Sequence, residues 1–116
     1  MRTNLGMDTG DYRQLLERIR DLLLSVGDTR WGPRLQCWIS ELDALRSRDE
    51  VAIMHHVRRT RRSVAGMGSI SDIVICNEAG HRVPKDDAEL NRLNDRLLTL
   101  ADSLFLTTAK LLNEEA

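Results

Sequence analysis

Residues with the potential for chemistry gather in the middle of this chain, between positions 55 and 81. Ser69, Asp72 and His81 are the side-chain types of a hydrolytic triad, but no G-x-S-x-G turn surrounds the serine. Three such residues close in sequence do not make a triad, which depends on their geometry. We therefore expect no enzymatic activity and no catalytic residue. Asp72 is expected to accept backbone N–H groups in a turn or to pair with an arginine.

Histidine and cysteine are too scattered in this sequence to predict a metal site. His55 and His56 are adjacent, so on a helix their side chains point about 100° apart and do not easily share one ion. Cys37 and Cys76 are the two cysteines, far apart and outside any C-x-x-C motif. We expect them to be free, buried thiols in a reducing compartment, and we expect no metal and no cofactor.

Arginine is concentrated in the stretch RRTRR, residues 58–62. On a helix, Arg58, Arg61 and Arg62 lie near one face, whereas Arg59 turns aside. Like charges within two turns repel one another, and three interpretations stay open. The arginines form a solvated face, they are neutralised by acidic residues of the C-terminal helix, or they await an external acidic or phosphate partner.

Charge and aromatic content make nucleic acid an unlikely partner for these arginines. The formal net charge is −1, from 17 Lys and Arg against 18 Asp and Glu, so the whole-molecule field does not attract a polyanion. No aromatic residue on which a base could stack lies near residues 58–62 in the sequence. A regulator that binds nucleic acid or a nucleotide phosphate through this cluster is therefore the second interpretation.

Two glycines follow the arginines, Gly66 and Gly68. A phosphate-binding loop follows a strand and opens a helix, whereas these glycines follow a predicted helix and no G-K-[ST] is present. We expect Gly66 to end that helix. Gly68 is expected to need a positive φ or a close approach to a neighbouring element. Both are predicted to be structural turn residues.

The elements that position these residues are predicted to be helices. Apolar residues spaced three and four apart indicate helices over about 9–26, 33–45, 49–63 and 86–113. The β-branched run at 73–76, followed by the turn residues NEAG, predicts a short β-hairpin between the third and fourth helices. The fold class is therefore mainly α, an antiparallel four-helix bundle with one short β-hairpin.

The chain is predicted to form a single helical domain over residues 1–116, with 1–8 flexible. The third helix has the thinnest apolar stripe, so we expect it to be the least buried and the natural place for a working surface. Leu97 and Leu100 of the fourth helix are expected in the core. No apolar run approaches the ~20 residues of a membrane span, and the N-terminus lacks an apolar signal core, so we expect no membrane contact and a cytoplasmic location.

The segment GMGSISDIVI, residues 66–75, resembles a turn in a family of small uncharacterised bacterial helical proteins. The shared pattern is GMGS, two residues, an aspartate and an aliphatic run. That family is similar to the immunity-type proteins encoded beside polymorphic toxins. The resemblance implies a protein-binding domain that neutralises a cognate toxin by occluding its active cleft, and it brings no catalytic residue. The near-neutral charge departs from the acidic character of inhibitors of cationic nucleases.

The densest positive charge, the thinnest apolar stripe and the predicted hairpin coincide, and this coincidence indicates a recognition surface. We expect a protein partner to bind there and the chain to be a monomer or a homodimer. The expected partner-binding residues are Arg58, Arg61, Arg62, Ser69, Asp72 and His81.

Overall fold

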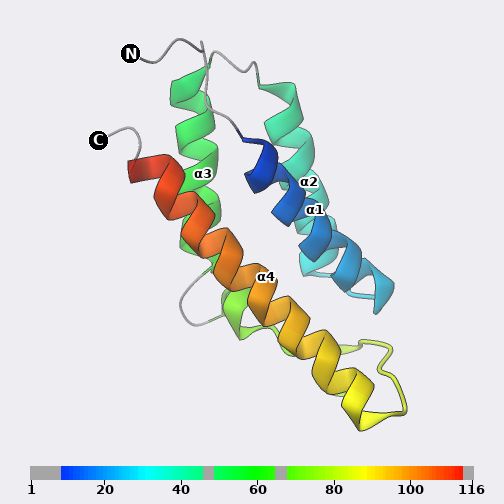
Figure 1. Cartoon of the computed structure of the whole chain (residues 1–116). Coiled ribbons are helices and arrows are strands. Elements are labelled where there is room, and N and C mark those ends of the chain that lie inside the picture. The colour runs from blue at the N-terminus through cyan, green and yellow to red at the C-terminus, as the bar shows by residue number, and fades with distance from the viewer. Residues whose placement is uncertain (1–8, 46–48, 65–67, 114–116) are drawn as a thin grey trace.

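A computed structural model describes residues 9–45, 49–64 and 68–113, and the regular structure within those ranges is helical. The elements in chain order are α1 (Gly10–Ser25), α2 (Trp31–Ala44), α3 (Glu50–Val64), the one-turn 3-10 helices η1 (Ile70–Asp72) and η2 (Asn77–Ala79), and α4 (Asp87–Asn113). Consecutive α-helices run in opposite directions, as in an antiparallel bundle (Figure 1). The predicted helical bundle is confirmed. The prediction for residues 1–8 lies outside the described residues.

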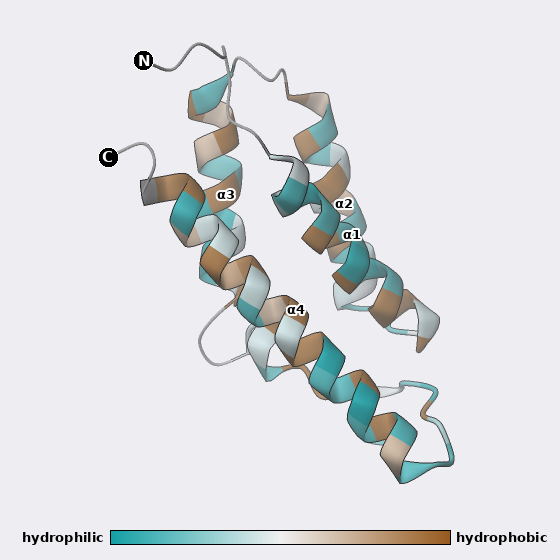
Figure 2. Ribbon diagram, in the orientation of Figure 1, coloured by the Kyte–Doolittle hydropathy of each residue, from teal (hydrophilic) through white to brown (hydrophobic). Residues whose placement is uncertain are grey.

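One hydrophobic core joins all four α-helices. In Figure 2 hydrophobic and hydrophilic stretches alternate along each helix, as expected when a single stripe faces inward. The predicted core positions Leu97 and Leu100 are 1% and 8% exposed. Leucine and isoleucine dominate the fully buried side chains, with Tyr12 as the largest of them.

The packing of the helices leaves one side of the bundle open. α1 packs against both α2 and α4, and α3 packs against α4, whereas α2 and α3 scarcely touch each other. The 27 residues of α4 give it a length of about 40 Å, so it forms the spine of a molecule 53 Å long and 22 Å across. The open side between α2 and α3 is therefore where a groove can form.

The prediction that α3 is the least buried helix is wrong. Its buried face contains the apolar residues that the sequence indicated and two polar residues, His56 and Thr60, which are 4% and 1% exposed. Polar side chains complete this stripe because they find hydrogen-bond partners inside the bundle, which removes the cost of burying them.

Capping contacts and glycine conformations mark several of the helix ends. Asp86 caps α4, since its Oδ1 accepts the N–H of Ala88 at 3.1 Å. Gly27, after α1, and Gly68, before η1, both have φ +75°. No heavy atom lies within 4 Å of the position that a Cβ on Gly68 would take, so positive φ rather than crowding favours glycine there. Gly66 lies outside the described residues.

The predicted β-hairpin between α3 and α4 is wrong, because residues 73–76 form no strand. The backbone of Ile75 pairs with a side chain instead. Asn94 of α4 accepts the Ile75 N–H through Oδ1 at 2.7 Å and donates from Nδ2 to the Ile75 carbonyl at 3.2 Å. Beyond the turn, the N–H of Arg82 bonds the carbonyl of Val26 at 2.8 Å. Because the backbone groups of Ile75 and Arg82 bond Asn94 and Val26, they do not pair with each other as the strands of a hairpin would.

None of the helices in the described ranges combines the length and the apolar character needed to cross a membrane.

We predict that Leu97→Ala lowers the free energy of unfolding by about 2–5 kcal/mol, because it leaves a cavity in a packed core. Leu98→Ala is the matched control, since the neighbouring Leu98 is 49% exposed, and it should change stability by no more than about 0.5 kcal/mol. Urea unfolding of both variants measures the difference. Equal midpoints for the two variants would show that the α4 stripe has been assigned to the wrong face.

Candidate functional site

The structure distributes the predicted site residues over two hollows and one internal contact. The arginine groove lies between α2 and α3, has a volume of about 440 Å³ and is lined by Glu41, Leu45, Ala52, His55, His56, Arg58, Arg59 and Arg62. The turn pocket lies between the start of α2 and the chain around η1, has a volume of about 290 Å³ and is lined by Asp28, Arg30, Trp31, Gly68, Ser69, Asp72, Ile73, Val74, Ala79 and His81.

The four arginines of residues 58–62 divide into two that pair with other helices and two that, among the described residues, do not. Arg61 reaches α4, where Nη1 donates to the Phe105 carbonyl at 3.2 Å and the guanidinium lies 4.3 Å from the centre of the Phe105 ring. Arg59 reaches α2 and pairs with Glu41 at 2.9 Å. Arg58 and Arg62 are exposed and have no hydrogen bond or ion pair within the described ranges. These two arginines remain available to a partner.

A buried hydrogen-bond network is centred on His56, which lines the arginine groove. Nε2 of His56 lies 2.7 Å from the carbonyl oxygen of Trp38, and Nδ1 lies 2.7 Å from the Tyr12 hydroxyl. The Tyr12 hydroxyl is also 2.6 Å from Oγ1 of Thr60. Because a carbonyl only accepts, Nε2 carries a proton. The network joins α1, α2 and α3 through one imidazole.

The His56 ring is held in its neutral form. Burial lowers the pKa of His56, the nearby charge of Arg59 adds to this effect, and together they outweigh the hydrogen bond to Trp38. Burial also raises the pKa of the Tyr12 phenol above its ordinary value. In the described part of the chain no buried side-chain polar atom lacks a hydrogen-bond partner. The polar atoms of this network are therefore all hydrogen-bonded, and His56 is uncharged at neutral pH.

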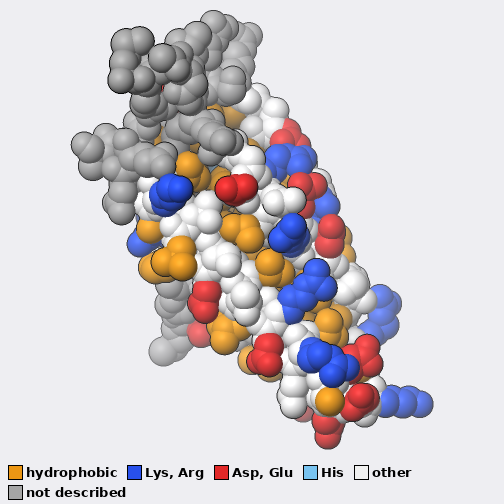
Figure 3. Space-filling model, in the orientation of Figure 1, with side chains coloured by type: hydrophobic (Ala, Val, Ile, Leu, Met, Phe, Trp, Pro, Cys, Tyr) orange, Lys and Arg blue, Asp and Glu red, His pale blue; other side chains and the backbone are white. Residues whose placement is uncertain are grey.

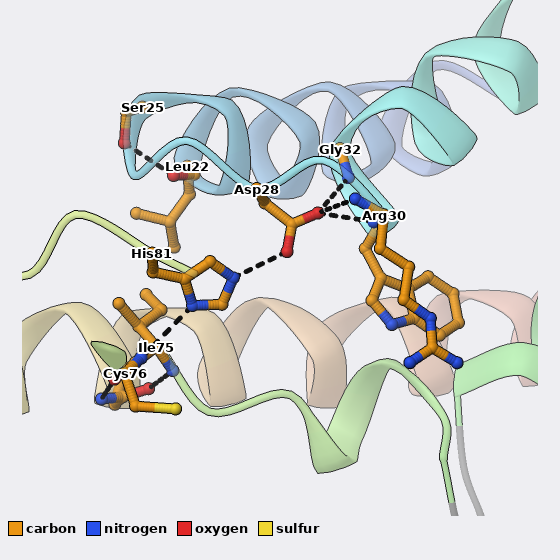
Figure 4. Close-up of polar contacts among 10 residues, drawn as sticks. Leu22, Ser25, Asp28, Arg30, Gly32, Ile75, Cys76 and His81 are labelled. Atoms are coloured by element: carbon orange, nitrogen blue, oxygen red, sulfur yellow. Dashed lines mark hydrogen bonds and ion pairs between the residues drawn. The ribbon is translucent and has the colours of Figure 1, made fainter. Parts of the chain in front are cut away.

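Asp28 organises one wall of the turn pocket, as Figure 4 shows. Its Oδ1 accepts the backbone N–H groups that start α2, from Arg30 at 3.0 Å, Trp31 at 2.5 Å and Gly32 at 2.9 Å. Its Oδ2 accepts from Nε2 of His81 at 2.7 Å. Burial works to raise the pKa of Asp28, but these hydrogen bonds outweigh it and leave the pKa below its ordinary value. Asp28 thus stays ionised and joins the α1–α2 turn to the chain before α4.

His81 is fully occupied by structural hydrogen bonds. Its Nδ1 accepts the backbone N–H of Cys76 at 3.2 Å, so the proton lies on Nε2 and is donated to Asp28. No ring nitrogen is left to activate Ser69, although both residues line the turn pocket. Asp72 accepts the N–H of Gly68 at 2.7 Å, which confirms its predicted role in the turn. In this geometry the three residues do not constitute a catalytic triad.

No cluster of three histidine, cysteine, aspartate or glutamate side chains with the spacing of a metal site occurs among the described residues. Both cysteines are free thiols, but the prediction that they are buried is wrong, because Cys37 is exposed and Cys76 is only partly buried.

The sequence analysis did not identify the buried polar residues beside the two hollows, namely Asp28, His56 and Thr60. Asp28 was part of a stretch, GDTRWGP, that reads as a connector. An aspartate shortly before a proline in a helical first turn is a signal for helix capping, and it could have been recognised. His56 and Thr60 gave no comparable signal, because their partners on α1 and α2 are far away in the sequence.

No protein-family model matches the chain, and neither a curated protein nor a solved structure matches it. The resemblance of residues 66–75 to an immunity-type family therefore stays a prediction.

We predict that stability decreases as the pH falls below about 6.5, the ordinary pKa of a histidine in an unfolded chain. The folded pKa of His56 is lower, so the unfolded chain binds the proton more readily between the two values. The contribution is fully present above pH ~6.5 and is lost as the pH falls toward the folded value.

Unfolding free energies of His56→Gln, His55→Gln and the parent, measured from pH 8 to pH 5, test this assignment. His56→Gln should lose this part of the pH dependence. His55→Gln should retain it, because the neighbouring His55 is exposed and makes no hydrogen bond within the described ranges. If the pH dependence disappears in His55→Gln and persists in His56→Gln, the assignment to the buried ring is wrong.

Proposed function

We propose that this chain is a protein-binding domain that holds an acidic surface of its partner against the arginine groove. The observation that carries the proposal is the pair Arg58 and Arg62, which lie one turn apart on α3, exposed and unpaired in the described part of the chain. Arginine is enriched at protein interfaces, where its planar fork binds carboxylates through two hydrogen bonds. Two such groups at the edge of a groove favour a carboxylate-bearing partner.

The two arginines belong to a longer outward stripe on α3. Val51, His55, Arg58 and Arg62 follow one another at helical spacing, and all four are exposed. Val51 is 71% exposed, the highest value among the exposed large apolar side chains of the described residues. The stripe thus offers an apolar contact at one end and positive charge at the other, a combination that suits the centre and rim of an interface.

Internal contacts hold this surface in place before any partner arrives. His56 fixes α3 to α1 and α2, Arg61 fixes it to Phe105 of α4, and Arg59 spans the groove to Glu41. A surface that is already ordered loses less conformational entropy on binding, so more of the contact energy appears as affinity.

Within this class we propose the immunity-type function, in which the domain neutralises a cognate toxin in the cytoplasm by covering its active cleft. The GMGS pattern of residues 66–75 supports the toxin as partner, and the two free thiols support a reducing compartment. An elongated, rigid bundle 53 Å long presents enough surface to cover a cleft.

We predict that Arg58→Glu combined with Arg62→Glu leaves folding intact and weakens binding to the protein encoded by the adjacent gene by at least about 100-fold. Reversing a charge at a desolvated pair costs roughly 2–5 kcal/mol, whereas unpaired surface arginines contribute little to folding. Calorimetric titration gives the affinity, and thermal unfolding checks the fold.

Arg92→Glu with Arg96→Glu is the matched control, because these two arginines are also exposed and one turn apart, on α4. The face that Figure 3 presents, with α4 toward the viewer, mixes basic, acidic and hydrophobic side chains and has no concentrated positive charge. The control should keep full affinity. Equal losses in both double variants would mean a non-specific effect of charge, and unchanged binding in the α3 variant would reject the groove as the interface.

A regulator that binds phosphate groups is the second candidate, favoured by the presence of Arg58, Arg59 and Arg62 around one groove. Ionic strength separates the two candidates. Affinity for a polyphosphate or nucleic acid should fall linearly with salt on logarithmic axes, and affinity for a packed protein surface should change much less.

A further inference from the structure

The turn pocket is a second site that the proposed function does not use. We propose that it binds a small zwitterion, a free α-amino acid with an apolar side chain. The proposal stands on the charges and walls of the pocket and is independent of the arginine groove, so either one can fail alone.

Three segments far apart in the sequence enclose the pocket, namely residues 28–31, 68–74 and 79–81. Its volume of about 290 Å³ is close to the lower end for small-molecule sites. The walls are tied to one another, since Asp28 bonds both the start of α2 and His81, and Asp72 closes its own turn on Gly68. A hollow held in this way is formed before the ligand arrives.

Opposite charges line the pocket without pairing with each other. Arg30 comes from the start of α2, and no hydrogen bond or ion pair to its guanidinium is found within the described ranges. Figure 4 shows its side chain extending away from Asp28. Asp72 comes from η1 and uses only Oδ2, for Gly68. A ligand that carries both charges can satisfy Arg30 with its carboxylate and Asp72 with its ammonium group.

Two other polar side chains of the pocket are held mainly by internal hydrogen bonds. Asp28 accepts three backbone N–H groups at Oδ1 and one from His81 at Oδ2, and both ring nitrogens of His81 are engaged. Arg30 and Asp72 therefore offer more free hydrogen-bonding capacity to a ligand than Asp28 or His81. Trp31, Ile73 and Val74 supply the apolar part of the lining, and Val74 is 59% exposed. The apolar side chain of an amino acid would cover them.

The test measures binding of L-leucine, L-valine and L-phenylalanine to the full chain by calorimetry and by NMR shifts of the amides around the pocket. At least one should bind saturably. N-acetyl-L-leucine lacks the ammonium charge and L-leucinamide lacks the carboxylate, so each should bind at least about tenfold more weakly than L-leucine. Failure of all three amino acids to bind, or equal binding of the two analogues and L-leucine, overturns the proposal.

Two variants connect each charge of the ligand to its residue. Arg30→Gln should remove the preference for L-leucine over L-leucinamide, and Asp72→Asn should remove the preference over N-acetyl-L-leucine. The asparagine oxygen can still accept the Gly68 N–H, so the turn is retained, and thermal unfolding checks it. Arg34→Gln is the control, because Arg34 lies over the Trp31 ring but outside the pocket lining. Unchanged preferences in the first two variants also overturn the proposal.

Discussion

The position of α3 relative to α1 and α2, and with it the arginine groove, depends on the imidazole of His56. α2 and α3 have little direct packing, yet the two nitrogens of this ring bond the Trp38 carbonyl of α2 and the Tyr12 hydroxyl of α1. A buried polar group without partners is costly, so other placements of α3 that break these bonds are disfavoured. Because the His56 side chain faces the interior of the bundle, the side chains of Arg58 and Arg62 face outward from the same helix.

Asp28 has a corresponding role at the other end of the molecule. Its carboxylate caps α2 and binds His81, a residue 53 positions later in the sequence. His56 and Asp28 show that apolar and polar contacts have different roles in this fold. Apolar stripes supply the driving force that brings helices together, whereas a few saturated polar contacts decide where the connecting segments lie. The two hollows are consequences of those polar contacts.

This difference in roles explains what the sequence could predict. Helical spacing was enough to place Leu97 in the core, and Asp86 was identifiable as a cap, because both depend on near neighbours in the chain. The hairpin prediction failed because β-propensity at residues 73–76 requires a pairing strand, and Asn94 of α4 bonds Ile75 in its place. His56 was weighed only as a metal ligand, since its partners come from other helices. The sequence identified the arginine cluster, but it did not show that Arg59 and Arg61 pair with other helices while Arg58 and Arg62, among the described residues, do not.

The central claim is that Arg61 supports the bundle whereas Arg58 and Arg62 do not. The stability of arginine variants tests this claim most directly. The account predicts that Arg61→Ala lowers the free energy of unfolding by about 1 kcal/mol, because it removes the contacts with the carbonyl and ring of Phe105. The double variant Arg58→Ala with Arg62→Ala should stay within about 0.5 kcal/mol of the parent, since neither side chain has a partner in the described part of the chain. A double variant that is as destabilised as Arg61→Ala, or more so, would contradict the account, because those arginines would then be internal supports of the bundle.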